Sequence, residues 1–477
     1  MSTHVPVVIA GAGISGLVCG YALRKAGVGV LVVEGAARPG GLIRSERRDG
    51  YLLEMGPQSF SGTAQIRTLC RELGIEQELV EAPARAPRFL LLDGQLRAVP
   101  LSPPAFFASS LFSAKTKWAL VRDVFAHHPP PEPDESMADF TRRKFSEELL
   151  DKLVGPFVSG IYAGDPEKLS LRAAFPQVHE AEKAAGSIIR GMLRAVKAKR
   201  KAAAANGAAP QKRERPTLQT FREGNETLVQ ALAANLGAAL RTGTSVKEIR
   251  RRDEGATGAG RYVVALERDG QREEITAEHV VLATPTDVTG RLLSGLSKEV
   301  ATALAPVEHA PVAVVSLGYA QAAVGRELNG FGFLIPRSAK VRTLGTVWNS
   351  SLFAGRAPSG HVLLTSFAGG ASDAAATTLG EVGLRELVHA ELAPILKIAS
   401  APAFASVTVY PRALPQYNLG HAARLASVQA ALVELPGVFL AGNYLRGPAI
   451  GACVEQALGV AEEIGGQIGR TATATRN

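Results

Sequence analysis

An early stretch of the chain has the pattern G-x-G-x-x-G directly after the apolar run 7–10. Its residues are Gly11, Ala12, Gly13, Ile14, Ser15 and Gly16. In such a pattern the first glycine allows a tight turn, the second lets the backbone approach a pyrophosphate, and the third lets a helix pack closely on a strand. A helix predicted over 17–26 would direct its free N-terminal amides at the phosphates. The pattern therefore predicts a dinucleotide site.

Two further motifs follow where such a site needs them. Glu34 comes directly after the apolar run 28–33, and an acid at this distance from the glycines suits a pair of ribose hydroxyls. The segment 38–45 carries paired glycines between arginines, which would place more amides and a cation beside the phosphates. An ordinary surface turn is the alternative for this segment. The stretch 51–59 is typical of a strand that enters a loop.

The composition limits the class of protein. A chain of 477 residues is too long for one core and indicates two or three domains. A hydrophobic share of 46% with 20% charged residues is ordinary for a soluble globular protein. The cysteines Cys19, Cys70 and Cys453 are far apart, which indicates a reducing compartment without a disulfide framework and predicts no metal site. A net charge of +9 permits an acidic partner and selects none.

Two segments bear on attachment to a membrane. We expect no signal peptide, because the first predicted strand begins within a few residues, and no run is long and apolar enough to span a bilayer. The segment 98–114 contains three prolines and is expected to expose Phe106, Phe107, Leu111 and Phe112, which suits a membrane surface or a domain interface. The basic segment 183–215 predicts a solvated helix end with a mobile loop, or an attraction to anionic lipid. Nucleic acid is disfavoured there because stacking aromatics are missing.

The remaining chain alternates strands and helices. A hairpin is predicted over 88–96 with its turn at Asp93-Gly94, and helices over 101–200. The string 158–170 is interpreted as a loop between helices, because its glycines allow close backbone approach. Further strands are expected at 244–249, 279–285, 311–320, 330–336, 343–348, 363–370 and 438–444. On residue type alone the apolar strands between 311 and 370 are sheet core.

Several of these strings together resemble the flavin amine oxidase and protoporphyrinogen oxidase superfamily. The resemblance is carried by the opening glycines, R-x-G-G-x-x-R-S at 38–45 and E-x-G-P at 54–57. It continues in R-F-L-L-L-D-G-Q-L at 88–96, S-G-I-Y-A-G-D at 159–165, L-P-Q-Y-N-L-G-H at 414–421 and G-N-Y at 442–444. Leu42 stands where many relatives have an arginine, as is common in the porphyrinogen-oxidising branch. The string at 159–165 is the most specific of these motifs.

The resemblance implies FAD as a non-covalent cofactor, since no cysteine stands where some relatives attach the flavin. Beyond the six residues of the opening turn, the implied cofactor-binding residues are Glu34, Gly35, Arg38, Gly41, Leu42, Gly56, Pro57, Gln58, Ser59, Val246, Gly442, Pro448, Ala449 and Ile450. The implied substrate-binding residues are Arg88, Gly160, Phe331, Leu334, Leu344, Val347 and Phe367. Among them, Arg88 would pair with a substrate propionate, and Gly160 would face the macrocycle. Cys453 is expected to be a packed helix residue.

The implied reaction is the six-electron oxidation of a porphyrinogen with molecular oxygen (O2) as acceptor and hydrogen peroxide as product. Protoporphyrinogen IX is the first choice of substrate and coproporphyrinogen III the alternative, with an amine or carotenoid substrate less favoured. The sequence offers no paired carboxylate or nucleophile–base pair, which fits a reaction carried by the flavin. A non-catalytic binder of the GDP-dissociation-inhibitor type is a further alternative, disfavoured by the complete second half of the flavin motif set.

The resemblance also implies an architecture. We expect an α/β protein with a Rossmann-like FAD-binding domain (1–80, 217–290 and 428–477) and a sheet-based substrate domain (81–95 and 291–427). A helical, membrane-associating domain is expected at 96–216, with a flexible basic loop near 201–216. The expected location is cytoplasmic, peripheral on the inner face of the cell membrane, without nucleic acid and with a homodimer as one option.

Overall fold

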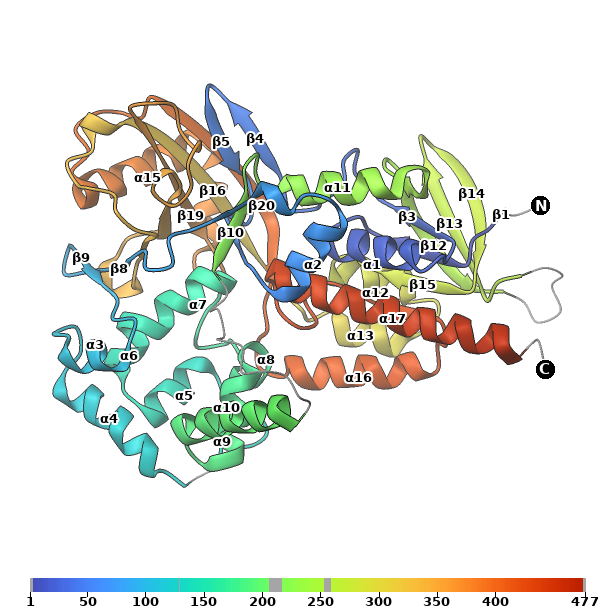
Figure 1. The fold of residues 1–477 in the computed structure, drawn as a ribbon, viewed down its shortest axis with the longest axis horizontal. Helices are drawn as coiled ribbons and strands as arrows, with labels where there is room; N and C mark the ends of the chain where they lie inside the picture. Colours follow the sequence, from blue (N-terminus) through green and yellow to red (C-terminus); the bar gives the residue numbers. More distant parts are fainter. Residues whose placement is uncertain (1–2, 128, 206–216, 253–258, 475–477) are drawn as a thin grey trace.

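A parallel sheet of five strands forms the first layer of the fold, in the order β11-β3-β2-β15-β21 (Figure 1). Its strands are β2 (Val7–Ala10), β3 (Val30–Val33), β11 (Leu240–Arg241), β15 (His279–Leu282) and β21 (Val438–Leu440). Most of their residues are buried, as expected for a parallel sheet covered on both faces. The computed structural model describes residues 3–127, 129–205, 217–252 and 259–474.

Helices cover one face of this parallel sheet, and a second sheet with further helices covers the other. The first face packs against α1 (Ile14–Lys25), α2 (Ala64–Glu72), α11 (Glu226–Leu236) and α17 (Ile450–Ala474). The second face packs against the antiparallel strands β12 (Ser245–Arg251), β13 (Tyr262–Arg268) and β14 (Gln271–Ala277), and against α12 (Thr286–Leu293), α13 (Lys298–Leu304) and α16 (His421–Val433). Strand β1 (Thr3–His4) pairs with β14 at the edge. The predicted α/β layering with a first strand–turn–helix unit is confirmed.

A seven-stranded sheet forms the second main layer, in the order β20-β16-β19-β18-β17-β8-β9. Its strands are β8 (Arg88–Leu92), β9 (Gln95–Ala98), β16 (His309–Ala320), β17 (Gly332–Leu334), β18 (Thr343–Trp348), β19 (His361–Gly369) and β20 (Phe404–Pro415). One face packs on α15 (Gly380–Leu396) in a core that includes Phe89, Phe333 and Trp348. The opposite face carries a separate apolar cluster around Val314 and Leu344. The predicted hairpin with its turn at Asp93-Gly94 is confirmed.

Shorter elements join the two layers. The hairpin β4–β5 packs against the seven-stranded sheet. The ring of Tyr51 in β5 lies over Gly318 of β16, in the space that a side chain on Gly318 would need. A small sheet in the order β6-β10-β7 lies beside the parallel layer. These elements are β4 (Ser45–Arg48), β5 (Tyr51–Glu54), β6 (Phe60–Ser61), β7 (Leu79–Glu81), β10 (Leu218–Phe221) and α14 (Asn349–Leu352).

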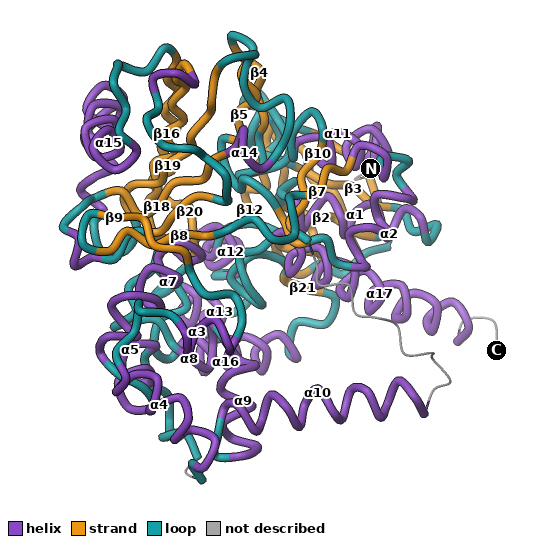
Figure 2. The backbone as a smooth tube through the Cα atoms, turned by 60° about the vertical axis from the view of Figure 1, so that its left-hand side comes forward, coloured by secondary structure: helices purple, strands orange, loops and turns teal. Residues whose placement is uncertain are grey.

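The stretch between β9 and β10 is helical and forms its own group below the two sheets (Figure 1). It contains α3 (Pro103–Ala108), α4 (Ala114–Phe125), α5 (Met137–Lys144), α6 (Glu147–Leu149), α7 (Gly155–Tyr162), α8 (Leu171–Ala174), α9 (Pro176–Ala185) and α10 (Ile188–Ala205). Figure 2 shows the end of α10 extending away from the other helices. No helix among the described residues combines the length and apolar character needed to cross a bilayer.

Three local predictions need correction. The string 158–170 is not one loop, because its first five residues complete α7 and only the rest, from the left-handed Ala163 (φ 46°), is a loop. In the segment 98–114, Leu111 and Phe112 are buried against α6, and Phe106 stacks on Phe112. Of the four side chains expected to be exposed there, only Phe107 is strongly so, at 44%.

The prediction of a flexible basic loop near 201–216 is wrong for its first five residues. The helix α10 continues through 201–205, where alanine favours helix. Residues 206–216 lie outside the described part of the chain.

Candidate functional site

The turn between β2 and α1 leaves an open cradle at its centre. Gly11 has a left-handed backbone (φ +98°), and a side chain there would lie 2.6 Å from the carbonyl oxygen of Ala283. A side chain at Gly16 would collide with the carbonyl oxygen of Gly11, so this glycine lets α1 pack on the turn. At Gly13, by contrast, an added Cβ would meet no described atom within 4 Å. The free space therefore lies at the second glycine, where a pyrophosphate would approach.

The paired-glycine loop forms a second wall of this cradle. Its Gly40 amide donates to the carbonyl oxygen of Ala12 at 2.7 Å, and a Cβ on Gly41 would lie 3.5 Å from the α-carbon of Gly13. The guanidinium of Arg38 donates to the carbonyl oxygens of Pro39, Gly41 and Ile43. Arg38 therefore shapes the loop with its hydrogen bonds, beyond the cationic role predicted for it.

The acid at the end of β3 is fixed beside the same turn. One carboxylate oxygen of Glu34 accepts from the amide of Ala12 at 2.8 Å, and the other from the amide of Ala36 at 2.9 Å. The segment before β12 joins it, because the Thr244 amide donates to the Glu34 carbonyl oxygen at 2.8 Å. Glu34 therefore lies at one end of the cradle, and Ser245, the neighbour of Val246, lies beside Gly35.

The loops after β15 and β21 complete the edge of the parallel sheet. The Gly442 amide donates to the Gln456 side chain of α17 at 3.0 Å, and Ala441 donates to the carbonyl oxygen of Leu282. Pro448 and Ala449 immediately precede α17, which begins at Ile450. Ligands of open parallel sheets bind beyond the carboxyl ends of the strands, and the predicted cofactor residues converge there. The cradle, its free helix amides and its acid fit a dinucleotide.

The loop after β5 approaches this edge from the second layer. Gly56 lies against the carbonyl oxygen of Leu42 so closely that any side chain there would collide. The buried amide of Gln58 donates to the carbonyl oxygens of Glu54 and Gly56 and accepts from Asn349 at 2.7 Å. Its side chain is thus committed to protein partners, whereas Pro57 and Ser59 are half-buried beside it.

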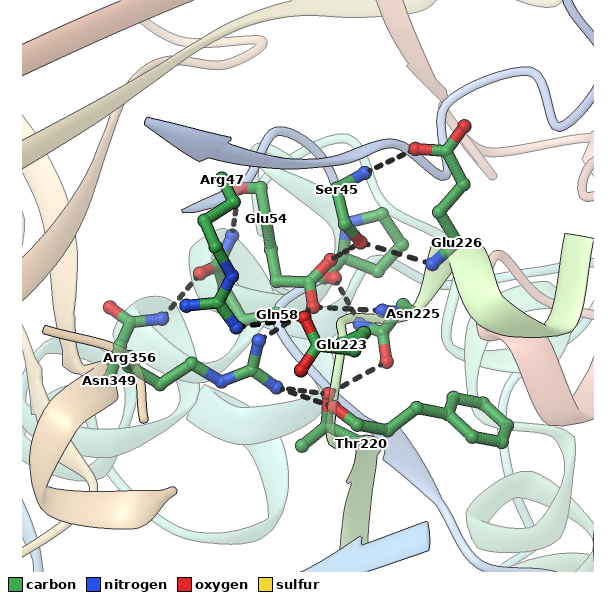
Figure 3. A network of polar contacts seen from close by, with 12 residues as sticks. Ser45, Arg47, Glu54, Gln58, Thr220, Glu223, Asn225, Glu226, Asn349 and Arg356 are labelled. Atoms are coloured by element: carbon green, nitrogen blue, oxygen red, sulfur yellow. Dashed lines mark hydrogen bonds and ion pairs between the residues drawn. The ribbon is translucent and has the colours of Figure 1, made fainter. Parts of the chain in front are cut away.

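A buried ion pair stands behind this loop (Figure 3). Glu54 and Arg356 are each 2% exposed, and their charged atoms are 3.3 Å apart. The carboxylate of Glu54 also accepts from the Ser45 hydroxyl at 2.7 Å and the Asn225 amide at 2.9 Å, whereas Arg356 donates to Thr220 and to the Phe221 carbonyl oxygen. Burial raises the pKa of Glu54 to about 7, although Arg356 and the two donors lower it. The network joins β5, β10 and the segment after β18.

The predicted substrate residues gather on the sheet face that looks away from α15. The guanidinium of Arg88 lies 5.4 Å from the centre of the Phe331 ring, and Arg88 is otherwise exposed. Gly160 of α7 faces Leu334 of β17, and a Cβ on Gly160 would lie 2.8 Å from the Leu334 side chain. The arginine and the aromatic ring thus lie at the start of the three-residue strand β17, and the helix edge lies at its end.

The remaining predicted substrate residues are neighbours on the next strands. Leu344 packs in one apolar cluster with Phe367 and Ala163, and Val347 packs in another with Phe331. In the sheet register Phe367 lies opposite Gly345, which in turn lies opposite Leu334. The structure therefore brings all seven residues to one region, from β8, α7, β17, β18 and β19.

Tyr410 of β20 connects this region to the cradle and was not predicted from the sequence. Its ring packs at the edge of the cluster of Leu344 and Phe367. Burial raises the pKa of Tyr410, and the nearby charges of Arg38 and Arg44 oppose that rise. The positive charges of Arg38 and Arg44, at the two ends of the paired-glycine loop, therefore act on a residue of the predicted substrate wall.

Other side chains that shape the site could also not be identified from the sequence, because nothing marks them as single residues. Arg356 and Asn349 reach the β5 loop from far along the chain, and neither belongs to a recognisable motif. Cys453 is buried as expected, and burial raises the pKa of its thiol to about 11. It is therefore an unreactive packing residue.

Comparisons with known proteins agree with this arrangement. A model of the family of flavin-containing amine oxidoreductases matches residues 14–465. A chloroplastic protoporphyrinogen oxidase from Nicotiana tabacum is 37% identical over 99% of this chain and 87% of its own. A coproporphyrinogen III oxidase from Bacillus subtilis is 28% identical over 94% of this chain and 96% of its own. The crystal structure of a protein from an Exiguobacterium species, assigned as a protoporphyrinogen oxidase, superposes with a TM-score of 0.77 at 25% identity, covering 98% of this chain and 100% of that one.

Proposed function

Because this chain belongs to the family of flavin-containing amine oxidoreductases, we propose that it is an FAD-dependent protoporphyrinogen oxidase. The observation that carries the proposal is the 37% identity to a plant protoporphyrinogen oxidase over 99% of the chain. Coproporphyrinogen III oxidases, at 28%, are more distant. The reaction converts protoporphyrinogen IX to protoporphyrin IX with O2 as acceptor, as a step of tetrapyrrole biosynthesis.

The residues of the cradle hold the cofactor without a covalent bond. The N-terminal amides of α1 bind the pyrophosphate, with Gly13 leaving the space for it. The carboxylate of Glu34 accepts the hydroxyls of the ribose. The N-terminus of α17, with Pro448 and Ala449 before it, faces the pyrimidine end of the ring. Bound FAD supplies a two-electron acceptor, and the protein supplies position and electrostatics.

The residues on the sheet face orient the porphyrinogen. Arg88 provides a cation at the rim for a propionate, where the pair is charge-assisted. Phe331 and Leu334 form an apolar wall for the macrocycle, extended by Leu344, Val347 and Phe367. Gly160 keeps the edge of α7 free of a side chain beside that wall. Holding the ring in one reactive geometry supplies much of the rate enhancement.

The test of this function uses the purified, FAD-loaded protein in air. Protoporphyrinogen IX and coproporphyrinogen III are supplied separately, and porphyrin fluorescence is followed over the spontaneous rate. The proposal expects rapid oxidation of protoporphyrinogen IX and a lower kcat/KM for coproporphyrinogen III. A higher kcat/KM for coproporphyrinogen III would reassign the substrate, and no oxidation of either would overturn the function.

We also propose peripheral attachment to the inner face of the cell membrane through the helical segment. One side of α4 carries cationic and aromatic residues at helical spacing, namely Lys115, Trp118, Arg122 and Phe125. The side chains of Trp118 and Phe125 are 66% and 71% exposed. Exposed apolar side chains on neighbouring α10 extend the surface, namely Met192, Leu193 and Val196. Apolar side chains flanked by cations suit the interface of an anionic bilayer.

Binding to lipid vesicles tests this attachment. The variant Trp118→Ser/Phe125→Ser should lose most cosedimentation with vesicles that contain anionic lipid. The matched control is Val433→Ser on α16, which removes a side chain that is 75% exposed far along the chain. Equal binding of both variants would contradict the assignment of this surface.

A further inference from the structure

The segment 416–421 is a motif whose role the site described above leaves open. It runs from the end of β20 to the first residue of α16 and contains Gln416, Tyr417 and His421, which are all at most 2% exposed. Polar side chains this deeply buried need partners. Their partners belong to two different parts of the molecule.

One set of contacts reaches the end of α7 and the loop that follows it. The side-chain amide of Gln416 donates to the carbonyl oxygen of Tyr162 at 2.9 Å. The backbone of Tyr417 accepts from the Ser170 amide at 2.8 Å, and its ring packs on the Tyr162 ring at 5.6 Å. Both ends of the loop after α7, at Tyr162 and Ser170, are thus attached to the segment. The first of them is two residues after Gly160.

The other set of contacts reaches the loop before α17. The hydroxyl of Tyr417 donates to the carbonyl oxygen of Asn443 at 2.7 Å. The imidazole Nε2 of His421 lies 2.8 Å from the carbonyl oxygen of Tyr444, so this nitrogen carries the proton. The two rings stack with centres 4.3 Å apart, which fixes each against the other.

We propose that Tyr417 and His421 are positioning residues that hold the loop 443–447 in register with α7. The proposal rests on the proposed function, because that function assigns α7 to the substrate and the start of α17 to the flavin. The two neighbouring rings hold two consecutive carbonyl oxygens of the loop, those of Asn443 and Tyr444, while Gln416 holds the end of α7. A misplacement of about 1 Å between reacting groups is enough to slow a reaction about a hundredfold. The segment therefore sets the distance between the two binding sites.

The variant Tyr417→Phe tests the proposal because it removes one hydroxyl and keeps the packed ring. Its control is Tyr262→Phe, since the Tyr262 hydroxyl is equally buried and donates to the carbonyl oxygen of Pro436 at 2.9 Å, away from the loop. Hydrogen exchange of the peptide 442–450 is measured first, with no need for turnover. We expect exchange there to accelerate about tenfold in Tyr417→Phe, as loss of one buried hydrogen bond predicts, and to be unchanged in Tyr262→Phe.

Two further readouts separate positioning from a general loss of stability. In Tyr417→Phe the dissociation constant of FAD should rise about tenfold, and kcat should fall about tenfold with KM within twofold. The pair His421→Gln and His421→Leu adds a graded test, because glutamine keeps an amide donor and should retain more of the kcat than leucine.

The outcomes are distinct from those that test the function itself. If the wild type does not oxidise porphyrinogens, the function fails, whereas exchange and FAD affinity still decide the role of the segment. If Tyr417→Phe matches Tyr262→Phe in exchange, FAD affinity and kcat, the positioning role is overturned.

Discussion

Gly160 of α7 and Leu334 of β17 stand so close that a methyl group on Gly160 would lie 2.8 Å from the Leu334 side chain. The two residues come from distant parts of the sequence, one from the helical segment and one from the seven-stranded sheet. Both were predicted to contact the substrate. Their contact shows that α7 seals one edge of the apolar wall.

A methyl group at Gly160 should therefore impair substrate binding more than folding. In Gly160→Ala the Leu334 side chain has to move, and we expect kcat/KM for the porphyrinogen to fall about tenfold or more. In the double variant Gly160→Ala/Leu334→Val the shorter valine side chain leaves room for the added methyl group, and part of the lost kcat/KM should be restored. The control is Gly459→Ala on an exposed stretch of α17, where the added methyl has free space and should add stability of about 1 kcal/mol. Equal kcat/KM in Gly160→Ala and the wild type would contradict the role of this contact.

Removal of the cation at Arg88 should raise KM and leave kcat almost unchanged. In Arg88→Met we expect KM to rise about tenfold or more, since a charge-assisted bond to a propionate is lost from both ground and transition states. Arg326→Met is the matched control, because its guanidinium also lies 5.4 Å from a phenylalanine ring, that of Phe89, which belongs to the core on the α15 side. A similar KM in both variants would show that Arg88 is an ordinary surface residue that does not bind the substrate.

The pH dependence of stability should report the buried pair of Glu54 and Arg356. The pKa of Glu54 is raised from 4.5 to about 7 in the folded protein, so its contribution to stability is present at low pH. That contribution is lost as the pH rises from about 4.5 through about 7. The variant Glu54→Gln should flatten this part of the profile of unfolding free energy against pH. An unchanged profile would show that Glu54 titrates normally.

Removing the partner of Glu54 should be most damaging at high pH. In Arg356→Met a buried carboxylate loses its counterion, and at pH 8 we expect a loss of about 3–5 kcal/mol in urea unfolding. The loss should be smaller at pH 5, where Glu54 is protonated. The double variant Glu54→Gln/Arg356→Met should recover much of the stability, because no unpaired charge remains.

A second buried charge network holds the helical segment together. Lys144 is 7% exposed, with its ammonium 2.7 Å from Glu182 and 3.4 Å from Asp123. In Lys144→Met the buried carboxylate of Asp123 loses its cation, whereas Glu182 keeps its ion pair with Arg143, and we expect a loss of about 3–5 kcal/mol. The exposed pair of Arg250 and Glu274 serves as control, and Arg250→Met should cost about 0.5 kcal/mol or less. A loss below about 1 kcal/mol for Lys144→Met would contradict this assignment.

Local patterns in the sequence were sufficient for the cradle. The glycine turn, the acid at Glu34 and the strands around them are set by neighbouring residues, so their spacing predicts them. The end of α7 was misread as a loop, as the last turn of α10 was. Glycine disfavours helix, yet Gly160 lies within α7, where any side chain would displace that of Leu334.

Contacts between distant residues could not be predicted in this way. Glu54 and Arg356 are separated by 302 positions, and Gln58 and Asn349 by 291. Nothing near Arg356 in the sequence marks it as a buried partner. The roles of Tyr417 and His421 likewise depend on the backbone of a loop beyond α16, which only the fold brings to them.

The central claim is that a flavin held by this chain takes electrons directly from protoporphyrinogen IX. The most direct measurement mixes the FAD-loaded protein with protoporphyrinogen IX without oxygen and follows the flavin absorbance at about 450 nm. We predict rapid loss of that absorbance, because each flavin accepts two of the six electrons of the reaction, and recovery of the absorbance with formation of porphyrin when oxygen is admitted. Absorbance that stays constant in the presence of protoporphyrinogen IX would contradict the claim.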